Sequence, residues 1–247
     1  MSKTFWNRLK VNWYRRGAAT SDFAKKVLPV ILKNALDAKT FLDVGCGCGA
    51  LTIPLAKKAK LVTALDPSLH MMDALKDELK KGKIKNVKTV NAAWRETTLK
   101  PHDAVICANV PELLKDDASF LKDADSIAKK AVFLVAGADP LADKFYYKEL
   151  FPLVFRKTFE PRSDYLKTYS MLHSLGIYAN VEIINYDFDQ PFTGMDEALE
   201  FWKEYMGIVT GEHDATLRDF LEKKLVKTKT GLIARFPKKS AVMWWRK

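Results

Sequence analysis

The segment FLDVGCGCGA, residues 41–50, places three glycines at alternate positions directly after an apolar run that carries an aspartate. Because glycine lacks a Cβ, such a turn lets a ligand approach the main chain closely. Gly45, Gly47 and Ala50 also spell G-x-G-x-x-A. Asp66 follows at about the 20-residue distance expected of a carboxylate that binds a ribose. The spacing therefore predicts a ligand that contains a nucleoside, bound at the carboxyl end of a strand.

Asp43 distinguishes two ligands of this kind. The diphosphate of NAD is anionic, and a carboxylate beside the glycine turn would repel it. S-adenosylmethionine has no phosphate and carries a sulfonium and an ammonium, which a carboxylate attracts by about 1–4 kcal/mol at a partly exposed site. Asp43 therefore favours S-adenosylmethionine as the cofactor over a dinucleotide.

Strand-like and helix-like segments alternate through the first half of the chain, which predicts a parallel α/β sheet with right-handed crossovers. Buried strands are expected at residues 40–45, 61–66, 87–92, 103–109 and 131–137, with helices at 50–59, 68–82 and 118–130. Ser68 is the expected N-cap of the second helix, and Gly82 its C′ residue. Pro54 requires the first helix to be short, because proline fits only the first turn.

The second half departs from this alternation. Residues 139–178 are aromatic and helix-like, and residues 179–188 read as a long strand. Two further helical stretches follow, the first opened by Thr193 and Asp196 as an imperfect capping box. The chain ends in a strand at residues 240–247. We expect one domain over residues 40–247, with helical insertions at about 139–178 and 193–230 that build a lid or substrate pocket.

The motifs LDVGCGCG and LDPS together resemble the first two motifs of the class I S-adenosylmethionine-dependent methyltransferases. The resemblance covers about residues 40–137. It implies a seven-stranded, mostly parallel, doubly wound Rossmann-like sheet with a reversed last strand. It also implies that Asp43, Gly45, Gly47 and Gly49 surround the methionine part of the cofactor, and that Asp66 takes the ribose hydroxyls.

The same resemblance assigns further residues to the cofactor. The family often has an acidic residue followed by a small one after the third strand, where adenine is recognised. This chain has Asn91, Ala92, Ala93 and Trp94 there, and an asparagine can still donate to or accept from adenine. Asn109 matches the fourth-strand motif that lines the reaction site. Three more residues are expected against the cofactor: Cys46, Pro67 and Met71.

Basic residues concentrate at the N-terminus of a chain whose formal net charge is +11. Residues 1–39 hold nine Lys or Arg against two Asp, and aromatic residues lie among the cations. This composition suits an anionic substrate, a nucleic acid or an acidic membrane surface. The alternative is an amphipathic helical segment whose aromatic side chains pack on the main domain, which is the interpretation we adopt for residues 1–39.

Three function hypotheses follow. The first is a small-molecule methyltransferase, of the broad group that includes quinone C-methyltransferases, acting by in-line displacement at the sulfonium methyl. The second is an RNA methyltransferase that grips phosphates with its N-terminal segment. The third is a pseudo-methyltransferase that binds the cofactor without catalysis. The motif NVPE, residues 109–112, only faintly resembles the N/D-P-P-aromatic motif of enzymes that methylate amino groups of nucleic acids.

The remaining expectations are negative or open. Cys46, Cys48 and Cys107 are too few for a disulfide framework and lack the spacing of a zinc site, so we expect no metal and a reducing cytoplasm. No apolar run reaches the length of a membrane span. The sequence assigns no catalytic residue or general base, no acceptor atom and no oligomeric state.

Overall fold

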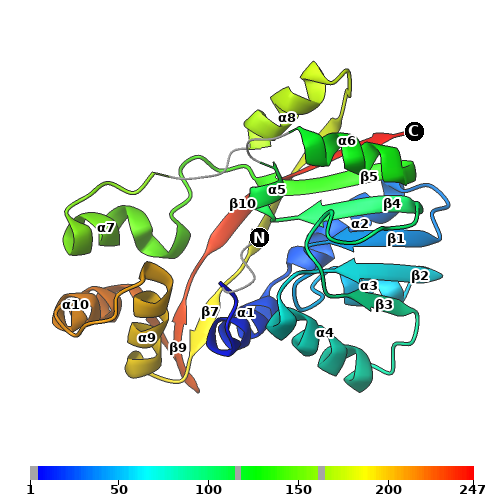
Figure 1. Ribbon diagram of the computed structural model, residues 1–247. Helices are drawn as coiled ribbons and strands as arrows, with labels where there is room; N and C mark the ends of the chain where they lie inside the picture. The colour runs from blue at the N-terminus through cyan, green and yellow to red at the C-terminus, as the bar shows by residue number, and fades with distance from the viewer. Residues whose placement is uncertain (1–4, 115–117, 161–164) are drawn as a thin grey trace.

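The computed structural model describes residues 5–114, 118–160 and 165–247, so residues 161–164 of the expected first insertion lie outside it. Its centre is a seven-stranded sheet in the order β3-β2-β1-β4-β5-β10-β6 (Figure 1). The strands are β1 (Thr40–Val44), β2 (Leu61–Leu65), β3 (Val87–Val90), β4 (His102–Ala108), β5 (Ala128–Gly137), β6 (Asn180–Asp187) and β10 (Pro237–Arg246).

The expected strand directions are confirmed. β1 pairs in parallel with β2 and β4, whereas β10 runs antiparallel to both β5 and β6. Because β6 is antiparallel to the reversed strand, it points the same way as β1 and β4. The ends of β1, β2, β4 and β6 and the start of β10 therefore share one edge of the sheet, which we call the carboxyl edge. Ligands bind at this edge in open α/β sheets.

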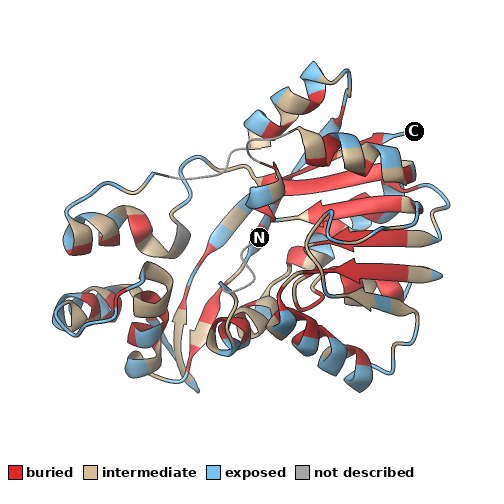
Figure 2. Ribbon diagram, in the orientation of Figure 1, coloured by how far each residue is buried: buried red, intermediate tan, exposed pale blue. Residues whose placement is uncertain are grey.

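Helices cover both faces of the sheet, and the central strands are buried (Figure 2). On one face lie α2 (Phe23–Asn34), α3 (Thr52–Ala56) and α4 (Leu69–Lys81). On the other lie α5 (Pro111–Leu114), α6 (Ser119–Ile127) and α8 (Tyr165–Ser174). The five-residue α3 holds Pro54 in its first turn, as expected.

Two expected helix boundaries need correction, and one is confirmed. The segment expected as a helix over 118–130 ends at Ile127, because β5 begins at Ala128 and uses the remaining residues. Ser68 does cap α4, and its hydroxyl accepts from the Met71 amide at 3.3 Å. Gly82, however, stays right-handed with φ −77°, and Lys83 takes the positive φ of 52° instead. Gly82 is therefore the C-cap residue of α4 rather than its C′ residue.

A small three-stranded sheet, which the sequence analysis did not anticipate, lies beside the second pair of inserted helices. It consists of β7 (Gln190–Phe192), β9 (Gly231–Ala234) and β8 (Val226–Thr228), in that order. With α9 (Met195–Met206), α10 (Asp214–Lys224) and α7 (Tyr147–Phe155), it surrounds a separate aromatic core (Figure 1). Strands of three and four residues show too little alternation to be recognised from sequence.

Helix α1 (Arg8–Thr20) lies between α4 and the small sheet (Figure 1), and contacts α4 and β7. Its Trp13 side chain is 1% exposed and packs on Phe201 of α9, with ring centroids 5.2 Å apart. On the opposite side, Val11 packs with Cys48 of the glycine turn and Met71 of α4. The helix therefore joins the small-sheet region to the edge where a ligand is expected. The division of the chain at residue 39 stays a prediction.

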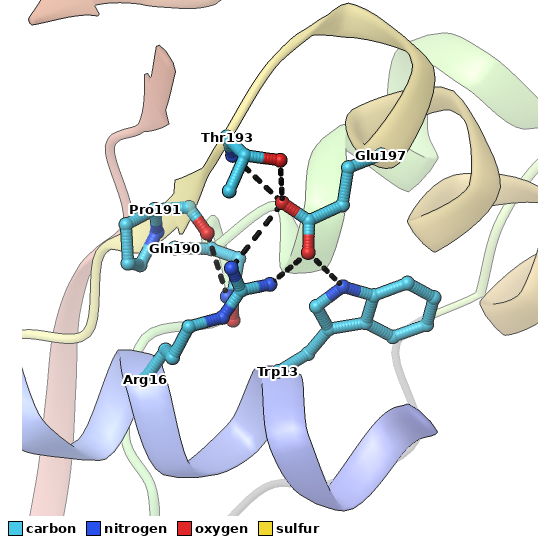
Figure 3. Close-up of polar contacts among 6 residues, drawn as sticks. All are labelled: Trp13, Arg16, Gln190, Pro191, Thr193 and Glu197. Atoms are coloured by element: carbon cyan, nitrogen blue, oxygen red, sulfur yellow. Dashed lines mark hydrogen bonds and ion pairs between the residues drawn. The ribbon is translucent and has the colours of Figure 1, made fainter. Parts of the chain in front are cut away.

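The carboxylate of Glu197 on α9 bonds to side chains of α1 and to the residues that follow β7 (Figure 3). It accepts from the Trp13 indole at 3.0 Å, from the Arg16 guanidinium, and from the Thr193 amide and hydroxyl at 2.7 and 2.8 Å. Burial of the Glu197 carboxyl raises its pKa, but these hydrogen bonds outweigh that effect and lower the pKa to about 2. The capping partner of Thr193 is thus Glu197 rather than the expected Asp196, and the N-cap itself is Gly194.

Replacing Glu197 by alanine is expected to lower the free energy of unfolding by about 1–3 kcal/mol, because four donor groups of Trp13, Arg16 and Thr193 lose their common acceptor. Asp196→Ala is the matched control, since that exposed carboxylate pairs only at the surface with Arg218. Urea denaturation measures both. Because the folded pKa of Glu197 lies below its usual 4.5, its contribution is full above that pH. The contribution is lost as the pH falls from 4.5 towards 2. The difference in the free energy of unfolding between the wild type and Glu197→Ala must therefore become smaller over this pH range.

Candidate cofactor site

The glycine turn is fixed to the neighbouring strand by main-chain bonds. The amides of Gly45 and Cys46 both donate to the Leu65 carbonyl of β2, at 2.8 and 3.1 Å. Gly45, Gly47 and Gly49 have φ values of 73°, 54° and 92°, a region that side chains disfavour. The alternating glycines thus place three left-handed residues within a stretch of five, and this sharp turn exposes main chain at the carboxyl edge.

Gly47 and Gly49 serve different purposes. A Cβ on Gly49 would lie 2.5 Å from Leu75 of α4 and 3.1 Å from Ile53 of α3, so this glycine permits close packing of two helices. A Cβ on Gly47 would meet only the Met71 sulfur, at 3.9 Å. Packing therefore does not require a glycine at position 47, whereas its left-handed φ of 54° favours one.

Asp43 lies under the turn rather than at its surface. Its side chain is 2% exposed, and one carboxylate oxygen accepts from the Thr52 hydroxyl of α3 at 2.6 Å. The expectation of a partly exposed carboxylate is therefore wrong, because the first turn of α3 folds over it. Burial raises the pKa of Asp43 to about 6, the Thr52 bond opposes this, and the nearby Asp66 adds to it. A buried carboxylate without a cation is costly, so the site suits a cationic ligand.

Binding of S-adenosylhomocysteine, whose ammonium remains a cation, is expected to weaken as the pH falls below about 6. The pKa of Asp43 in the free protein is raised to about 6, so the proton must leave before the carboxylate can attract a cation. Affinity should be constant above that pH and fall by up to about tenfold per pH unit below it. Isothermal titration calorimetry across this range measures the slope. A flat profile from pH 5 to 8 would contradict the assignment of Asp43.

Asp66 ends β2 and organises the turn. Its two oxygens accept from the Gly47 amide at 3.0 Å and the Ser68 amide at 2.8 Å, and it is 3% exposed. Burial raises its pKa, and the two main-chain bonds oppose the shift. Each oxygen keeps a second acceptor position, so ribose hydroxyls can bind without displacing either amide. The ribose contact itself stays a prediction.

A narrow pocket lies next to the turn, where the resemblance places adenine. It is lined by Val44, Gly45, Leu65, Pro67, Ala92, Ala93, Trp94 and Leu113. The indole of Trp94 donates to Asp123 at 3.2 Å and packs edge-on against Phe120 at 5.0 Å, which fixes it as one wall. The Asn91 amide donates to the Asp66 carbonyl at 2.9 Å. Its carbonyl oxygen is the group left to accept from an adenine amino group.

Cys46, Met71 and Asn109 complete the residues expected at the cofactor. The Cys46 thiol packs on Met72 at 3.8 Å in the core, which leaves only its main chain to face a ligand. Met71 is buried beneath Gly47. Asn109 follows β4 with a φ of 56°, its amide donates to Val135 at 2.9 Å, and its side chain is exposed at the carboxyl edge.

The comparisons with known proteins agree with this geometry. Residues 41–131 match a family model described as a methyltransferase domain. This match covers less than half of the chain. The chain as a whole has the Rossmann-like fold of the class I methyltransferases, with the reversed strand between β5 and β6. Methyltransferases of this class take their methyl group from S-adenosylmethionine, and the buried carboxylate and the open main chain at Gly47 fit this cofactor.

Two relatives match this chain over different lengths. An uncharacterised protein of Haemophilus influenzae is 25% identical over 218 residues, which are 86% of this chain and 78% of that protein. A protein of Methanosphaera stadtmanae named probable ribosomal RNA small subunit methyltransferase A is 33% identical over 109 residues. That match covers 43% of this chain and 40% of the relative. The chain thus spans about two fifths of the length of this second relative.

Solved structures match the fold over nearly the whole chain. A candidate methyltransferase of Bacillus halodurans C-125 has a TM-score of 0.59 at 20% identity, and the match covers 90% of this chain and 99% of that one. Magnesium protoporphyrin IX methyltransferase of Synechocystis PCC 6803, crystallised with S-adenosylhomocysteine, has a TM-score of 0.52 at 15% identity. That match covers 96% of this chain and 87% of that one. These likenesses establish the fold and leave the acceptor open.

Sequence reasoning missed three groups at the carboxyl edge. Thr52 bonds Asp43, and only its place in the first turn of a short helix after the glycines hinted at this contact. Tyr14 of α1 and Tyr186 of β6 come from segments far outside the matched motifs. The sequence places both beside charged or aromatic neighbours without indicating that the fold brings them to this edge.

Proposed function

We propose that the methyltransferase transfers a methyl group from S-adenosylmethionine to a small-molecule acceptor. The observation that supports this most strongly is the position of α1, which packs over the glycine turn through Val11, Cys48 and Met71. An enzyme that methylates a large nucleic acid needs an open groove at the sulfonium, whereas here the protein's own helix packs against the glycine turn. Within the described residues, no helix has both the length and the apolar character needed to cross a membrane.

Methyl transfer from S-adenosylmethionine needs no protein group to protonate the leaving thioether. S-adenosylmethionine supplies a methyl group on a sulfonium, and the thioether that leaves is neutral and needs no proton. The Asp43 carboxylate orients the cationic end, the turn at Gly47 holds the main chain close to it, and α1 keeps water away from the edge. Alignment and exclusion of water account for several kcal/mol in such reactions.

The basic N-terminal segment supports the small-molecule proposal when its partners are counted. Lys10 pairs with Glu204 at 3.2 Å, Arg15 with Glu78, and Arg16 with Glu197. Three cations that would otherwise be available to an anionic partner are therefore paired within the fold, in agreement with a segment that packs on the main domain. Trp13 and Tyr14, the aromatic residues among them, pack on α9 and on the segment after β6.

RNA remains the second candidate acceptor, because the Methanosphaera stadtmanae relative, which matches this chain over 109 residues, has the name of a ribosomal RNA methyltransferase. An RNA acceptor predicts a binding behaviour that a small-molecule acceptor does not. Binding to RNA through phosphates falls steeply as salt rises, so fluorescence anisotropy with a ribosomal RNA fragment at low salt tests it directly. Tight binding that weakens with salt would favour RNA.

A transfer assay decides between the two acceptors. Tritium-labelled S-adenosylmethionine is incubated with the protein and either total cellular RNA or the small-molecule fraction of a cell extract. We expect label to enter the small-molecule fraction and to remain absent from RNA. Label in RNA alone would overturn the proposal, and label in neither fraction despite tight cofactor binding would indicate a pseudo-methyltransferase.

A further inference from the structure

Thr52, the first residue of α3, lies against the Asp43 carboxylate. Its side chain is fully buried, and its hydroxyl donates to Asp43 Oδ2 at 2.6 Å. The Thr52 main chain also hydrogen-bonds this carboxylate. Within the part of the chain that the structure describes, Asp43 makes no ion pair and no hydrogen bond to another side chain. Thr52 is therefore the residue that stabilises the charge of this buried carboxylate.

The Thr52 hydroxyl is not used by its own helix. The N-cap of α3 is Leu51, which makes no side-chain bond to the helix. Threonine hydroxyls in helices often bond a carbonyl of the preceding turn, whereas this hydroxyl donates to a strand residue nine positions earlier in the chain. Because the bond joins α3 to β1, formation of the helix does not require it. Its effect falls on the charge of Asp43.

The surroundings of Asp43 otherwise oppose its ionisation. Burial and the nearby Asp66 of β2 both raise the pKa of Asp43, and the bonds from Thr52 act against them. Loss of the hydroxyl would therefore raise this pKa further, because the bond favours the charged form. Burial raises the pKa of the other titratable groups that interact with Asp43 and keeps them neutral; they are Cys46 of the turn, Cys107 of β4 and Tyr14 of α1.

We propose that Thr52 is a positioning residue for the cofactor, whose hydroxyl keeps Asp43 ionised and holds its carboxylate in the orientation that meets the cationic end of S-adenosylmethionine. An ionised carboxylate has about four acceptor positions, so the bonds from Thr52 leave room for a cation. Thr52 acts through Asp43 and need not touch the ligand. The proposal rests on the role of Asp43 in cofactor binding and is independent of which acceptor is methylated.

Calorimetric titration with S-adenosylhomocysteine from pH 5 to 8 tests the proposal on the wild type and Thr52→Val. Valine resembles threonine in shape but has no hydroxyl. The wild-type affinity should be constant above about pH 6, the pKa of Asp43. In Thr52→Val this limit should move up by about one pH unit, the effect of losing one hydrogen bond to a charged group. The variant should bind about five- to tenfold more weakly at pH 5 to 6 and almost equally at pH 8.

Three further variants show whether the shift comes from the hydroxyl and from Asp43. Thr52→Ser keeps the hydroxyl and should keep the wild-type pH profile. Thr168→Val is the matched control, because Thr168 is 2% exposed and its hydroxyl donates to the Leu114 carbonyl at 2.9 Å, not to a carboxylate. Its profile should also match the wild type. Added to Asp43→Asn, Thr52→Val should cause no pH-dependent change, which separates the titration of Asp43 from that of Asp66.

Two outcomes would overturn the role of Thr52. The first is a pH limit that does not move in Thr52→Val, including an equal loss of affinity at every pH, which is the mark of a purely structural threonine. The second is a shift that also appears in Thr52→Ser. If Thr52→Val does not fold, Thr52→Cys fills the same space with a weak donor and should shift the limit in the same direction.

Failure of the cofactor assignment would look different. If the wild type binds S-adenosylhomocysteine with a limit near pH 6 and Thr52→Val behaves alike, the inference about Thr52 is wrong and the role of Asp43 stands. If the wild type does not bind S-adenosylhomocysteine, or binds it equally at every pH, the role of Asp43 fails and the role of Thr52 fails with it.

Discussion

Asp43→Asn is expected to abolish most of the binding of S-adenosylhomocysteine while leaving the protein at least as stable. Asparagine has nearly the same shape and keeps an acceptor for the Thr52 hydroxyl, which bonds Asp43 at 2.6 Å. The substitution removes only the negative charge. We expect the affinity to fall at least tenfold, since a carboxylate and a cation at a protein site attract by about 1–4 kcal/mol.

The stability of the same variant gives an independent check. The pKa of Asp43 is raised from its usual 3.8 to about 6, so the ionised side chain at neutral pH costs the free folded protein about 3 kcal/mol. This cost is absent below pH 3.8 and complete above pH 6. Asp43→Asn removes it, and the melting temperature without ligand should rise or stay level at neutral pH. A variant that melts lower and still binds the ligand would contradict this role.

Asp66 needs different treatment. Replacement of Asp66 by alanine would leave the Gly47 and Ser68 amides without acceptors. Such a loss costs about 1–3 kcal/mol for each buried group, so this change is expected to destabilise the fold as well as to remove the carboxylate. The substitutions Asp43→Asn and Asp66→Ala therefore report on different properties, and only the first isolates the charge.

The second prediction with a large effect concerns the glycines of the turn. Gly49→Ala should reduce the free energy of unfolding by about 2–4 kcal/mol, because its Cβ would lie 2.5 Å from Leu75 at a φ of 92°. Gly47→Ala should cost only about 1 kcal/mol, since its Cβ meets just the Met71 sulfur at 3.9 Å. Yet Gly47→Ala should also lose at least tenfold in affinity for S-adenosylhomocysteine, because the methyl group occupies the ligand's approach.

The control for these glycines is Gly194→Ala. This residue has an extended φ of −176°, and a Cβ added there would meet no atom within 4 Å. Urea denaturation and calorimetry should separate the three variants. Gly49→Ala should be destabilised, Gly47→Ala should be nearly as stable as the wild type but bind the ligand weakly, and Gly194→Ala should keep both stability and binding. Equal loss of stability in Gly47→Ala and Gly49→Ala would indicate that the turn is only a packing feature.

The sheet and the cofactor turn could be predicted because their signals are local. The central strands of the sheet are compact apolar runs, and three glycines in five residues favour a left-handed turn. The burial of Asp43 could not be predicted, since it depends on how α3 folds back to bring Thr52 over it. Likewise, nothing local to Gly82 shows that Lys83 will take the positive φ.

The contacts of α1 were the least predictable part of the site. The sequence showed a basic, aromatic segment and left open whether it faced nucleic acid or the protein. Its partners Glu78, Glu197 and Glu204 lie 63 to 197 residues away, so charge counting over residues 1–39 gave no sign of the pairing.

The central claim is that the carboxyl edge binds a cationic nucleoside donor and excludes a diphosphate. Isothermal titration of the wild-type protein at neutral pH with S-adenosylhomocysteine, and separately with NAD, tests it most directly. We expect one equivalent of S-adenosylhomocysteine to bind and NAD to give no heat of binding. Binding of NAD without binding of S-adenosylhomocysteine would contradict it.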